Sequence, residues 1–228
     1  MRKYDIILLD ADDTVFDFKQ AELLALKRLF NLYGIPNTEE NIRDYQQIND
    51  DLWRRFELGE VTKDYLLDHR FVFFFEEKGI KADGVQANQD YLDGLAEGNI
   101  LLPGALELVQ RMKQLGCKVY LATNGVTRVQ KQRLATSQLK DLCDGIFVSE
   151  EAGSQKPQKE YFDYVLDKLG HPDLKKVLMV GDSLSSDIKG AVAYGIPCCW
   201  LNRKGQTTDL PVDYIVTSVP DILTAIEA

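Results

Sequence analysis

The sequence is poor in the side chains that most often bind zinc or act as catalytic bases. It holds only two histidines, His69 and His171, and four cysteines, none of them in a CxxC pair. Zinc sites and histidine-based triads draw on these residue types, so both kinds of site are poorly supported. The cysteines lie in or beside apolar stretches, and we interpret them as reduced core residues: Cys117, Cys143, Cys198 and Cys199.

Long apolar runs and positive charge are also scarce. No stretch approaches the roughly 20 apolar residues that a membrane-spanning helix needs. The first three residues lead straight into a predicted strand, which leaves no room for a signal peptide, so we expect a cytoplasmic protein. The sequence has 27 Lys and Arg against 36 Asp and Glu, a net charge of −9. Such a surface repels nucleic acid and anionic membranes, and therefore favours a small-molecule partner.

The most informative stretch is YDIILLDADDT, near the start of the chain. Residues 5–9 are mostly large and apolar, which predicts a strand buried on both faces. Asp10, Asp12 and Asp13 follow within four positions. Side chains alternate along an extended segment, so Asp10 and Asp12 point the same way from the end of the strand. Parallel sheets keep their active sites at that end.

Two adjacent carboxylates repel each other, and three interpretations of the pair stay open. The first is a solvated acidic turn. The second is a site for a divalent cation, which prefers oxygen ligands. The third is a pair in which one carboxyl stays protonated as an acid while its neighbour is ionised as a nucleophile. The last two are compatible with each other.

After residue 100 the chain alternates between helices and strands, which predicts an α/β fold with a parallel sheet covered on both faces. Pro103 opens the first helix and Gly116 closes it. Further helices are predicted at 126–139, 157–169 and 183–194. Strands are predicted at 117–123, 145–148, 176–181, 197–201 and 214–216, with the last two at the edge of the sheet.

Between residues 17 and 99 the pattern is helical throughout. Apolar residues recur at helical spacing in 21–34, 42–58 and 62–78, and a further helix is expected over 88–96. We therefore predict an inserted all-helical cap at 17–99, and a core made of 1–16 and 100–228. The aromatic patch from Phe71 to Phe75 is expected to form the cap core or a contact between caps.

Three further signals fall at the ends of predicted strands. Thr123 ends one strand and is followed by Asn124 and Gly125, a sharp turn that exposes a hydroxyl and backbone amides to an anion. Lys156 precedes a proline that opens a helix. The segment GDSLSSD follows the strand KVLMV. Taken singly, each has a structural explanation, such as capping of the next helix.

Taken in order, the acid pair, the Thr, the Lys-Pro and the GDS with a later Asp resemble the haloacid dehalogenase-like superfamily. The resemblance covers nearly the whole chain and implies a Rossmann-like core with a C1-type helical cap inserted after the first strand. It implies that Asp10 is the nucleophile and Asp12 the general acid and base. It also implies a phosphate site at Thr123, Asn124 and Lys156, and a Mg²⁺ site, with Mn²⁺ as an alternative, at Asp10, Asp12 through its backbone carbonyl, Asp182, and Asp187 directly or through water.

The resemblance also indicates which reaction and which substrate class to expect. An acid at Asp12 points to phosphate ester hydrolysis, in which the leaving alkoxide needs a proton, whereas dehalogenases lack it. The superfamily commonly has Gly where this chain has Asp13. The run DADDT followed by VFDF looks like the bacterial house-cleaning 5′-nucleotidases, which act on pyrimidine and noncanonical nucleoside monophosphates. A nucleoside monophosphate is thus the expected substrate. We expect the protein to be a monomer or a homodimer.

The charge at such a site is unbalanced. Four carboxylates and a phosphate dianion outweigh Mg²⁺ and Lys156, so we expect one carboxyl, Asp12, to stay protonated. Candidates for contacts with the leaving group are Phe16, Phe18, Trp53, Arg54 and Arg55, although core packing explains most aromatic residues here. Aromatic faces stack on bases with about 1 to 3 kcal/mol each.

Four alternatives remain at this stage. A phosphatase for another small metabolite, such as a sugar phosphate or phosphoglycolate, and a phosphomutase would use the same core. A response-regulator receiver also combines acids, a Thr and a Lys around Mg²⁺, but its acids lie on different strands and it has no helical insertion. An inactive binding module is disfavoured because every expected catalytic position is filled.

Overall fold

The computed structural model describes residues 2–227 and divides into two compact units. The core contains the chain up to Phe18 and from Asn99 onward, and the cap contains Lys19–Gly98. From the sequence we predicted boundaries after residues 16 and 99. The observed boundaries differ from these by two residues and by one.

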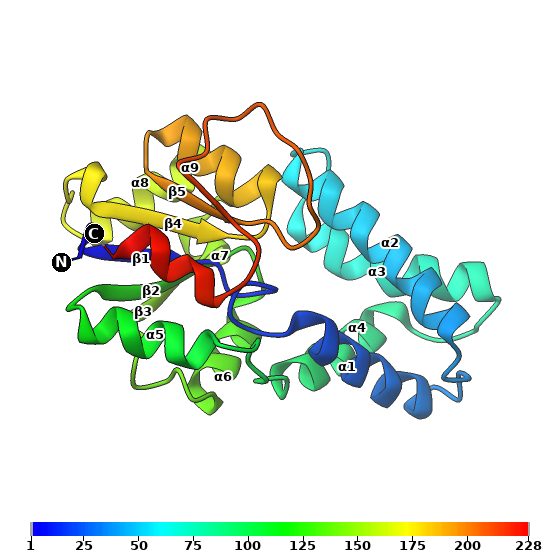
Figure 1. Ribbon diagram of the computed structural model, residues 1–228. Coiled ribbons are helices and arrows are strands. Elements are labelled where there is room, and N and C mark those ends of the chain that lie inside the picture. The colour runs from blue at the N-terminus through cyan, green and yellow to red at the C-terminus, as the bar shows by residue number, and fades with distance from the viewer. Residues whose placement is uncertain (1, 228) are drawn as a thin grey trace. The chain divides into compact units, whose positions relative to one another are not determined.

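The core is built on a six-stranded parallel sheet in the order β3-β2-β1-β4-β5-β6. The predicted α/β, Rossmann-like fold is confirmed (Figure 1). One strand was placed wrongly, because β5 pairs with β4 on one side and β6 on the other and is not an edge strand. The strands are β1 (Ile6–Leu9), β2 (Lys118–Thr123), β3 (Gly145–Val148), β4 (Val177–Gly181), β5 (Cys198–Leu201) and β6 (Tyr214–Val216).

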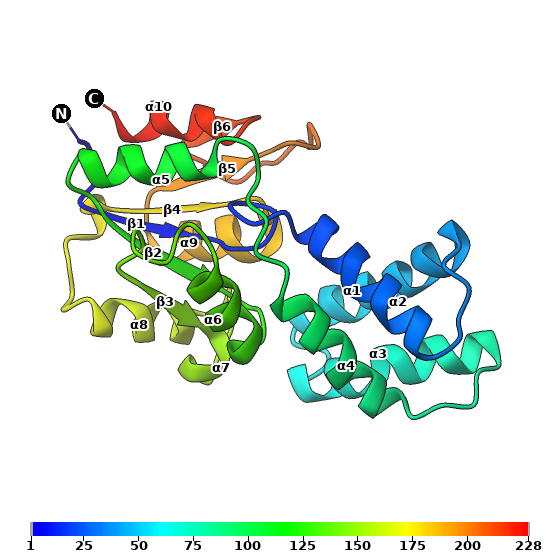
Figure 2. The ribbon, with the colours of Figure 1, turned by 90° about the horizontal axis from the view of Figure 1, so that it is seen from below.

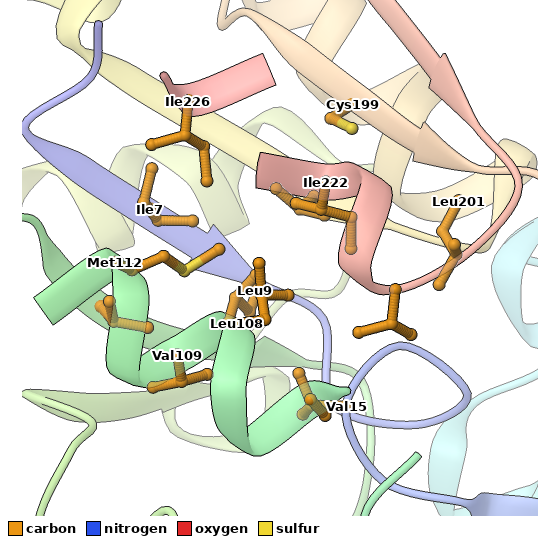
Figure 3. Close-up of a cluster of buried hydrophobic side chains, with 14 of the residues drawn as sticks. Ile7, Leu9, Val15, Leu108, Val109, Met112, Cys199, Leu201, Ile222 and Ile226 are labelled. Carbon is orange, nitrogen blue, oxygen red and sulfur yellow. The ribbon is translucent and has the colours of Figure 1, made fainter. Parts of the chain in front are cut away.

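Helices cover both faces of this sheet, which is why β1 is apolar at every position. Ile7 and Leu9 belong to the cluster formed with α5 (Ala105–Gln114) and α10 (Leu223–Ile226) (Figure 3). Ile6 and Leu8 face the other cluster, formed with α8 (Lys159–Lys168) and α9 (Lys189–Tyr194). Figure 2 shows α5 and α10 side by side on one face of the sheet. A strand between two helical layers has no solvent face, so alternation is lost.

The remaining core helices are α6 (Thr127–Thr136) and α7 (Ser149–Ala152). The short helices α7 and α10, each of four residues, were not predicted from the sequence. One continuous helix was predicted over 183–194, whereas the chain makes a π-helical turn at Leu184–Ile188 before α9 begins.

The cap consists of α1 (Phe18–Leu32), α2 (Glu39–Glu57), α3 (Lys63–Lys78) and α4 (Gly84–Ala96), of which α1 begins on the last core residue. Thr38 and Thr62 cap α2 and α3 by accepting backbone N–H groups with their hydroxyls. Helix α4 begins four residues earlier than predicted because Asp83 caps it, accepting from two backbone amides. In the aromatic patch, Phe71, Phe74 and Phe75 are buried in the cap.

Two broader expectations can be compared with the fold. All four cysteines are free, and three of them are fully buried in the core. Within residues 2–227, none of the helices combines the length and apolar character that crossing a membrane requires.

Candidate active site

Two of the carboxylates singled out above follow neighbouring strands in the middle of the sheet. Asp10 directly follows β1, and Asp182 directly follows β4. The strands pair with Leu9 opposite Val180, so Asp182 starts only one residue further along its strand than Asp10. The strand order runs outward from β1 in both directions, and the topology therefore reverses at this edge. Open α/β sheets bind ligands at that point.

Lys156 reaches the same edge from the loop before α8 and is almost fully buried. Its ammonium donates to Asp10 Oδ1 at 2.7 Å and to the carbonyl of Ala122 at 2.5 Å. It also lies 2.6 Å from Asp187 Oδ1, at the far end of the GDS segment. One buried cation thus joins the residue after β1, the end of β2 and the turn that follows β4.

Burial and close spacing shift the pKa values of the ionisable groups in this cluster. Burial raises the pKa of Asp10 well above its ordinary value, Lys156 opposes the shift, and the nearby Asp187 and Asp182 add to it. Burial lowers the pKa of Lys156, but Asp10 and Asp187 more than compensate, and the net pKa is raised. Lys156 therefore stays charged.

Asp10, Asp182 and Asp187 offer carboxylate oxygens that all lie within 4.8 Å of one another. Burial raises the pKa of Asp182 to about 7, with Asp187 and Asp13 adding to the shift. Burial also raises the pKa of Asp187, against the effect of Lys156. These three hard oxygen donors carry more negative charge than the buried Lys156 ammonium offsets, and they fit a divalent cation such as Mg²⁺.

The π-helical turn explains how Asp187 reaches this cluster. Ser183 caps the turn by accepting from the amide of Ser186, as the sequence suggested, and its own N–H donates to Asp187 Oδ2 at 3.2 Å. A Cβ at Gly181 would lie 2.0 Å from that same oxygen. Glycine is therefore needed at the end of β4 because the Asp187 carboxylate lies against its backbone.

The loop after β2 completes this edge. The Thr123 hydroxyl is buried and accepts from the amide of Gly125 at 3.0 Å. Asn124 exchanges two hydrogen bonds of 2.9 Å with the backbone of Lys156. In this structure, Asn124 thus acts as a tie between the two loops that carry the Thr and the Lys.

Asp12 lies beside this cluster and is held by two residues that the sequence analysis did not single out. Gln130 donates to one of its carboxylate oxygens, and Arg133 forms an ion pair with the other. Our charge count omitted Arg133, so the charge excess no longer argues by itself for a protonated Asp12. The available signal was that Gln130 and Arg133 fall on the same face of α6 as the apolar Val129.

Asp13 has a backbone conformation that favours glycine. Its φ of 56° lies in the left-handed region, which Gly adopts freely and Asp tolerates. Arg203 donates to its carbonyl at 2.6 Å and lies 3.5 Å from its carboxylate. Arg203 therefore supports the turn that contains Asp12.

One specificity candidate is corrected. Phe16 is fully buried, and the Arg133 guanidinium lies 4.6 Å from the centre of its ring. Its ring belongs to the core and is not available to a leaving group. Phe18 is half-buried at the start of α1.

The other candidates lie on α2 of the cap. Trp53 is half-buried, and Arg54 is exposed. Both arginines have acidic partners within the cap: Arg54 lies 2.7 Å from Asp51, and Arg55 lies 3.6 Å from Glu60.

The fold and the site together define a Rossmann-like α/β protein whose carboxylate cluster, at the switch point of the sheet, suits a divalent cation. The family model of haloacid dehalogenase-like hydrolases matches residues 4–195. The chain therefore belongs to the haloacid dehalogenase-like hydrolase family.

Individual relatives cover nearly the whole chain. The HAD-hydrolase YfnB of Bacillus subtilis is 42% identical over 89% of this chain and 86% of its own. The pyrimidine 5′-nucleotidase YjjG of Escherichia coli is 37% identical over 96% of both chains. The pyrimidine 5′-nucleotidase PynA of Streptococcus pneumoniae is 32% identical over 98% of this chain and 95% of its own.

A crystal structure of YfnB bound to magnesium is similar throughout. It superposes with a TM-score of 0.91 at 38% identity and covers 98% of both chains.

Proposed function

We propose that this protein is a Mg²⁺-dependent phosphomonoester hydrolase that forms an aspartyl-phosphate on Asp10 and prefers pyrimidine nucleoside 5′-monophosphates. The observation that carries the proposal is the buried Lys156 between Asp10 and Asp187, with Asp182 within reach of both acids. This arrangement supports the proposal, because a carboxylate that can act as a nucleophile, a fixed positive charge and a set of oxygen ligands lie at one edge of the sheet.

The chemistry follows from the residues. An oxygen of Asp10 attacks phosphorus, the bond from phosphorus to the nucleoside oxygen breaks, and Asp12 donates a proton to that leaving oxygen. Asp12 then takes a proton from water as the water oxygen attacks the aspartyl-phosphate. The bond from phosphorus to Asp10 breaks, inorganic phosphate is released, and the Asp10 carboxylate is restored.

The other side chains prepare this reaction. Lys156 offsets the negative charge that accumulates when a phosphate dianion approaches Asp10. The Thr123 hydroxyl lies at the end of the adjacent strand, where it can donate to a phosphate oxygen. Mg²⁺, held by Asp10, Asp182 and Asp187 with the Asp12 carbonyl, would screen the charges of nucleophile and phosphate.

The substrate class rests on the relatives. Two proteins that match this chain over at least 95% of its length, YjjG and PynA, are pyrimidine 5′-nucleotidases. The third, YfnB, has been crystallised with magnesium. Within the cap, Trp53 is the candidate for stacking on a base, whereas Arg54 and Arg55 already have acidic partners.

The test is phosphate release in the presence of Mg²⁺ from a matched panel. UMP, dUMP, TMP and CMP are compared with AMP and GMP, and with glyceraldehyde 3-phosphate and phosphoglycolate. We expect kcat/KM for the pyrimidine nucleotides to exceed that for the others by about tenfold or more, equivalent to about 1.4 kcal/mol of discrimination. EDTA should abolish the activity, and added Mg²⁺ should restore it.

The outcomes separate the parts of the proposal. A preference for a sugar phosphate or phosphoglycolate would keep the mechanism and overturn the nucleotide assignment. Undiminished activity in EDTA would overturn the requirement for a metal. No phosphate release from any ester in the panel would overturn the hydrolase assignment.

A further inference from the structure

The carboxylate of Asp12 is held at both oxygens by a single helix. Gln130 Nε2 donates to Asp12 Oδ2 at 2.6 Å. Arg133 forms a charge-assisted hydrogen bond with Oδ1. Both partners come from α6 and lie one helical turn apart, so they project from the same face.

These partners are themselves fixed in place. Arg133 is fully buried, and its guanidinium lies over the ring of Phe16 at 4.6 Å. Arg133 also donates to Gln130 Oε1 at 3.4 Å, which turns the NH₂ group of that amide toward Asp12. The orientation of the Gln130 amide therefore follows from its two neighbours.

Gly125 makes room for this arrangement. A Cβ at this position would lie 2.2 Å from Gln130 Nε2 and 2.7 Å from its Cγ. Any side chain would push Gln130 away from Asp12. The close approach of Gln130 therefore explains the glycine in the Thr-Asn-Gly turn.

From this geometry we infer that Gln130 and Arg133 are positioning residues for Asp12. They hold its carboxyl in one rotamer, aimed at the oxygen that leaves phosphorus. The inference rests on the proposed function, because it assigns a partner to the proton transfer described there. Each residue bonds to the Asp12 carboxylate, and each therefore acts through Asp12.

The assignment extends to the two oxygens. A hydrogen bond from a charged donor is about twice as strong as one from a neutral donor. Arg133 therefore keeps its bond to Oδ1 during the whole reaction. The weaker bond from Gln130 to Oδ2 breaks when that oxygen gives its proton to the leaving group, and Oδ2 later accepts a proton from water. Each turnover returns Oδ2 to the state in which it began.

A purely structural Arg133 is the competing explanation, and the choice of leaving group distinguishes the two. The alkoxide that leaves UMP needs a proton, whereas the nitrophenolate that leaves p-nitrophenyl phosphate hardly does. Loss of positioning lowers kcat/KM, which reports the steps up to formation of the aspartyl-phosphate, only for the first substrate, because general acid catalysis is worth about 10² to 10⁴-fold and is needed only there. The later attack of water on the aspartyl-phosphate is common to both substrates and does not enter kcat/KM. Loss of structure harms both substrates equally.

The experiment compares Arg133→Met, which keeps an apolar side chain of similar length, with Arg133→Lys, Gln130→Ala and the exposed Arg128→Gln on the same helix. We expect Arg133→Met to lower kcat/KM for UMP by about 10 to 100-fold. The kcat/KM for p-nitrophenyl phosphate should fall less than about threefold. Arg133→Lys should recover part of the loss, Gln130→Ala should show the same selectivity, and Arg128→Gln should change neither substrate.

A double-mutant cycle adds a second readout. In an Asp12→Asn background, Arg133→Met should lower kcat for UMP by less than about twofold further, because the residue it positions is already disabled. Equal losses with both substrates, or independent losses in the cycle, would overturn the positioning role while leaving the phosphatase intact. If Arg133→Met does not fold, Gln130→Ala decides by the same comparisons. A wild-type protein that releases no phosphate from either substrate would overturn the proposed function, and this inference with it.

Discussion

The core and the cap both bury charged side chains, but they balance that charge differently. In the cap, an amide joins one acid to one base. Asn49 donates to Glu22 at 3.5 Å and accepts from Arg70 at 3.2 Å. Gln46 donates to Glu22 at 2.8 Å, and the Arg70 guanidinium lies 4.6 Å from the centre of the Tyr91 ring. When Glu22 is ionised, its charge is offset by that of Arg70 within the cap.

In the core, the buried charges are not matched. Lys156 pairs with Asp10 and Asp187, and Asp182 adds a third carboxylate to the same cluster. Burial and mutual repulsion raise the pKa of Asp10 and of Asp182. The nearby positive side chains do not offset the negative charge of these acids.

The difference separates structure from function. Where hydrogen bonds connect a buried acid to a buried base, the two charges offset each other and no further ion is needed. Such a pair has a structural role in packing. A cluster with excess negative charge is incomplete until a cation joins it, and such clusters are typical of functional sites. Neutralising an acid should therefore have different consequences in the two units.

The sharpest contrast comes from neutralising one acid in each unit with its amide counterpart. Asp10→Asn removes the proposed nucleophile and should lower phosphate release from UMP by about 10³-fold or more. Glu22→Gln keeps the shape of the cap acid and should change the rate less than about threefold. Steady-state kinetics measure both, and circular dichroism establishes that both variants are folded. Substantial turnover by Asp10→Asn would contradict the covalent mechanism.

The second contrast concerns the metal. Mg²⁺ should raise the Tm of the wild type, because an ion that binds only the folded state stabilises it by about 3 kcal/mol when present at a hundred times its Kd. Asp182→Asn should lose most of this stabilisation, since it replaces one of the three carboxylates with a neutral amide, which is a weaker ligand for Mg²⁺. Asp141→Asn, an exposed acid of the core, is the control. Equal stabilisation of all three proteins in thermal melts would place the cation elsewhere.

The third contrast uses pH. Burial raises the pKa of Glu22 to about 7 from 4.5. The folded state then holds this proton more tightly than the unfolded state, so stability is lost as pH rises from about 4.5 to about 7. The total loss is at most about 3 kcal/mol. Glu22→Gln has no such proton, and its stability relative to the wild type should increase over that range.

Urea denaturation at several pH values between 5 and 8 measures this effect. Arg111→Gln, which alters an exposed core ion pair, should follow the wild type. If the curves of Glu22→Gln and the wild type run parallel across this range, Glu22 is ionised throughout, and the cap charges are balanced at every pH.

Much of the site could be predicted because parallel strands bring their carboxyl ends to one edge. Once the strands before Asp10, Thr123 and Asp182 were recognised, topology alone placed these side chains near one another. The cap helices could be predicted from their polar caps and apolar faces, as Thr38 and Thr62 show. These signals are local, and each can be read from a few adjacent residues.

The missed features depend on contacts between distant segments. Arg133 lies in a helix with a polar sequence, and only the tertiary structure shows that it is buried beside Asp12. The π-helical turn arises because Asp187 must reach Lys156 and lie against Gly181. Strand order is likewise tertiary, which is why β5 was misplaced at the edge.

Asp13 offers the last and smallest contrast, because it is a core acid that has its own cationic partner. It lies 3.5 Å from Arg203, so by the logic above it should be as dispensable as a cap acid. Asp13→Gly suits the φ of 56° and keeps the backbone acceptor for Arg203, and its free energy of unfolding should stay within about 0.5 kcal/mol of the wild type. Asp13→Ala has no such freedom and should lose about 1 kcal/mol. Urea denaturation in Mg²⁺ measures both variants, and UMP hydrolysis should change less than about threefold in each. A large loss of activity in Asp13→Gly would show that this carboxylate belongs to the unbalanced cluster, despite its pairing with Arg203.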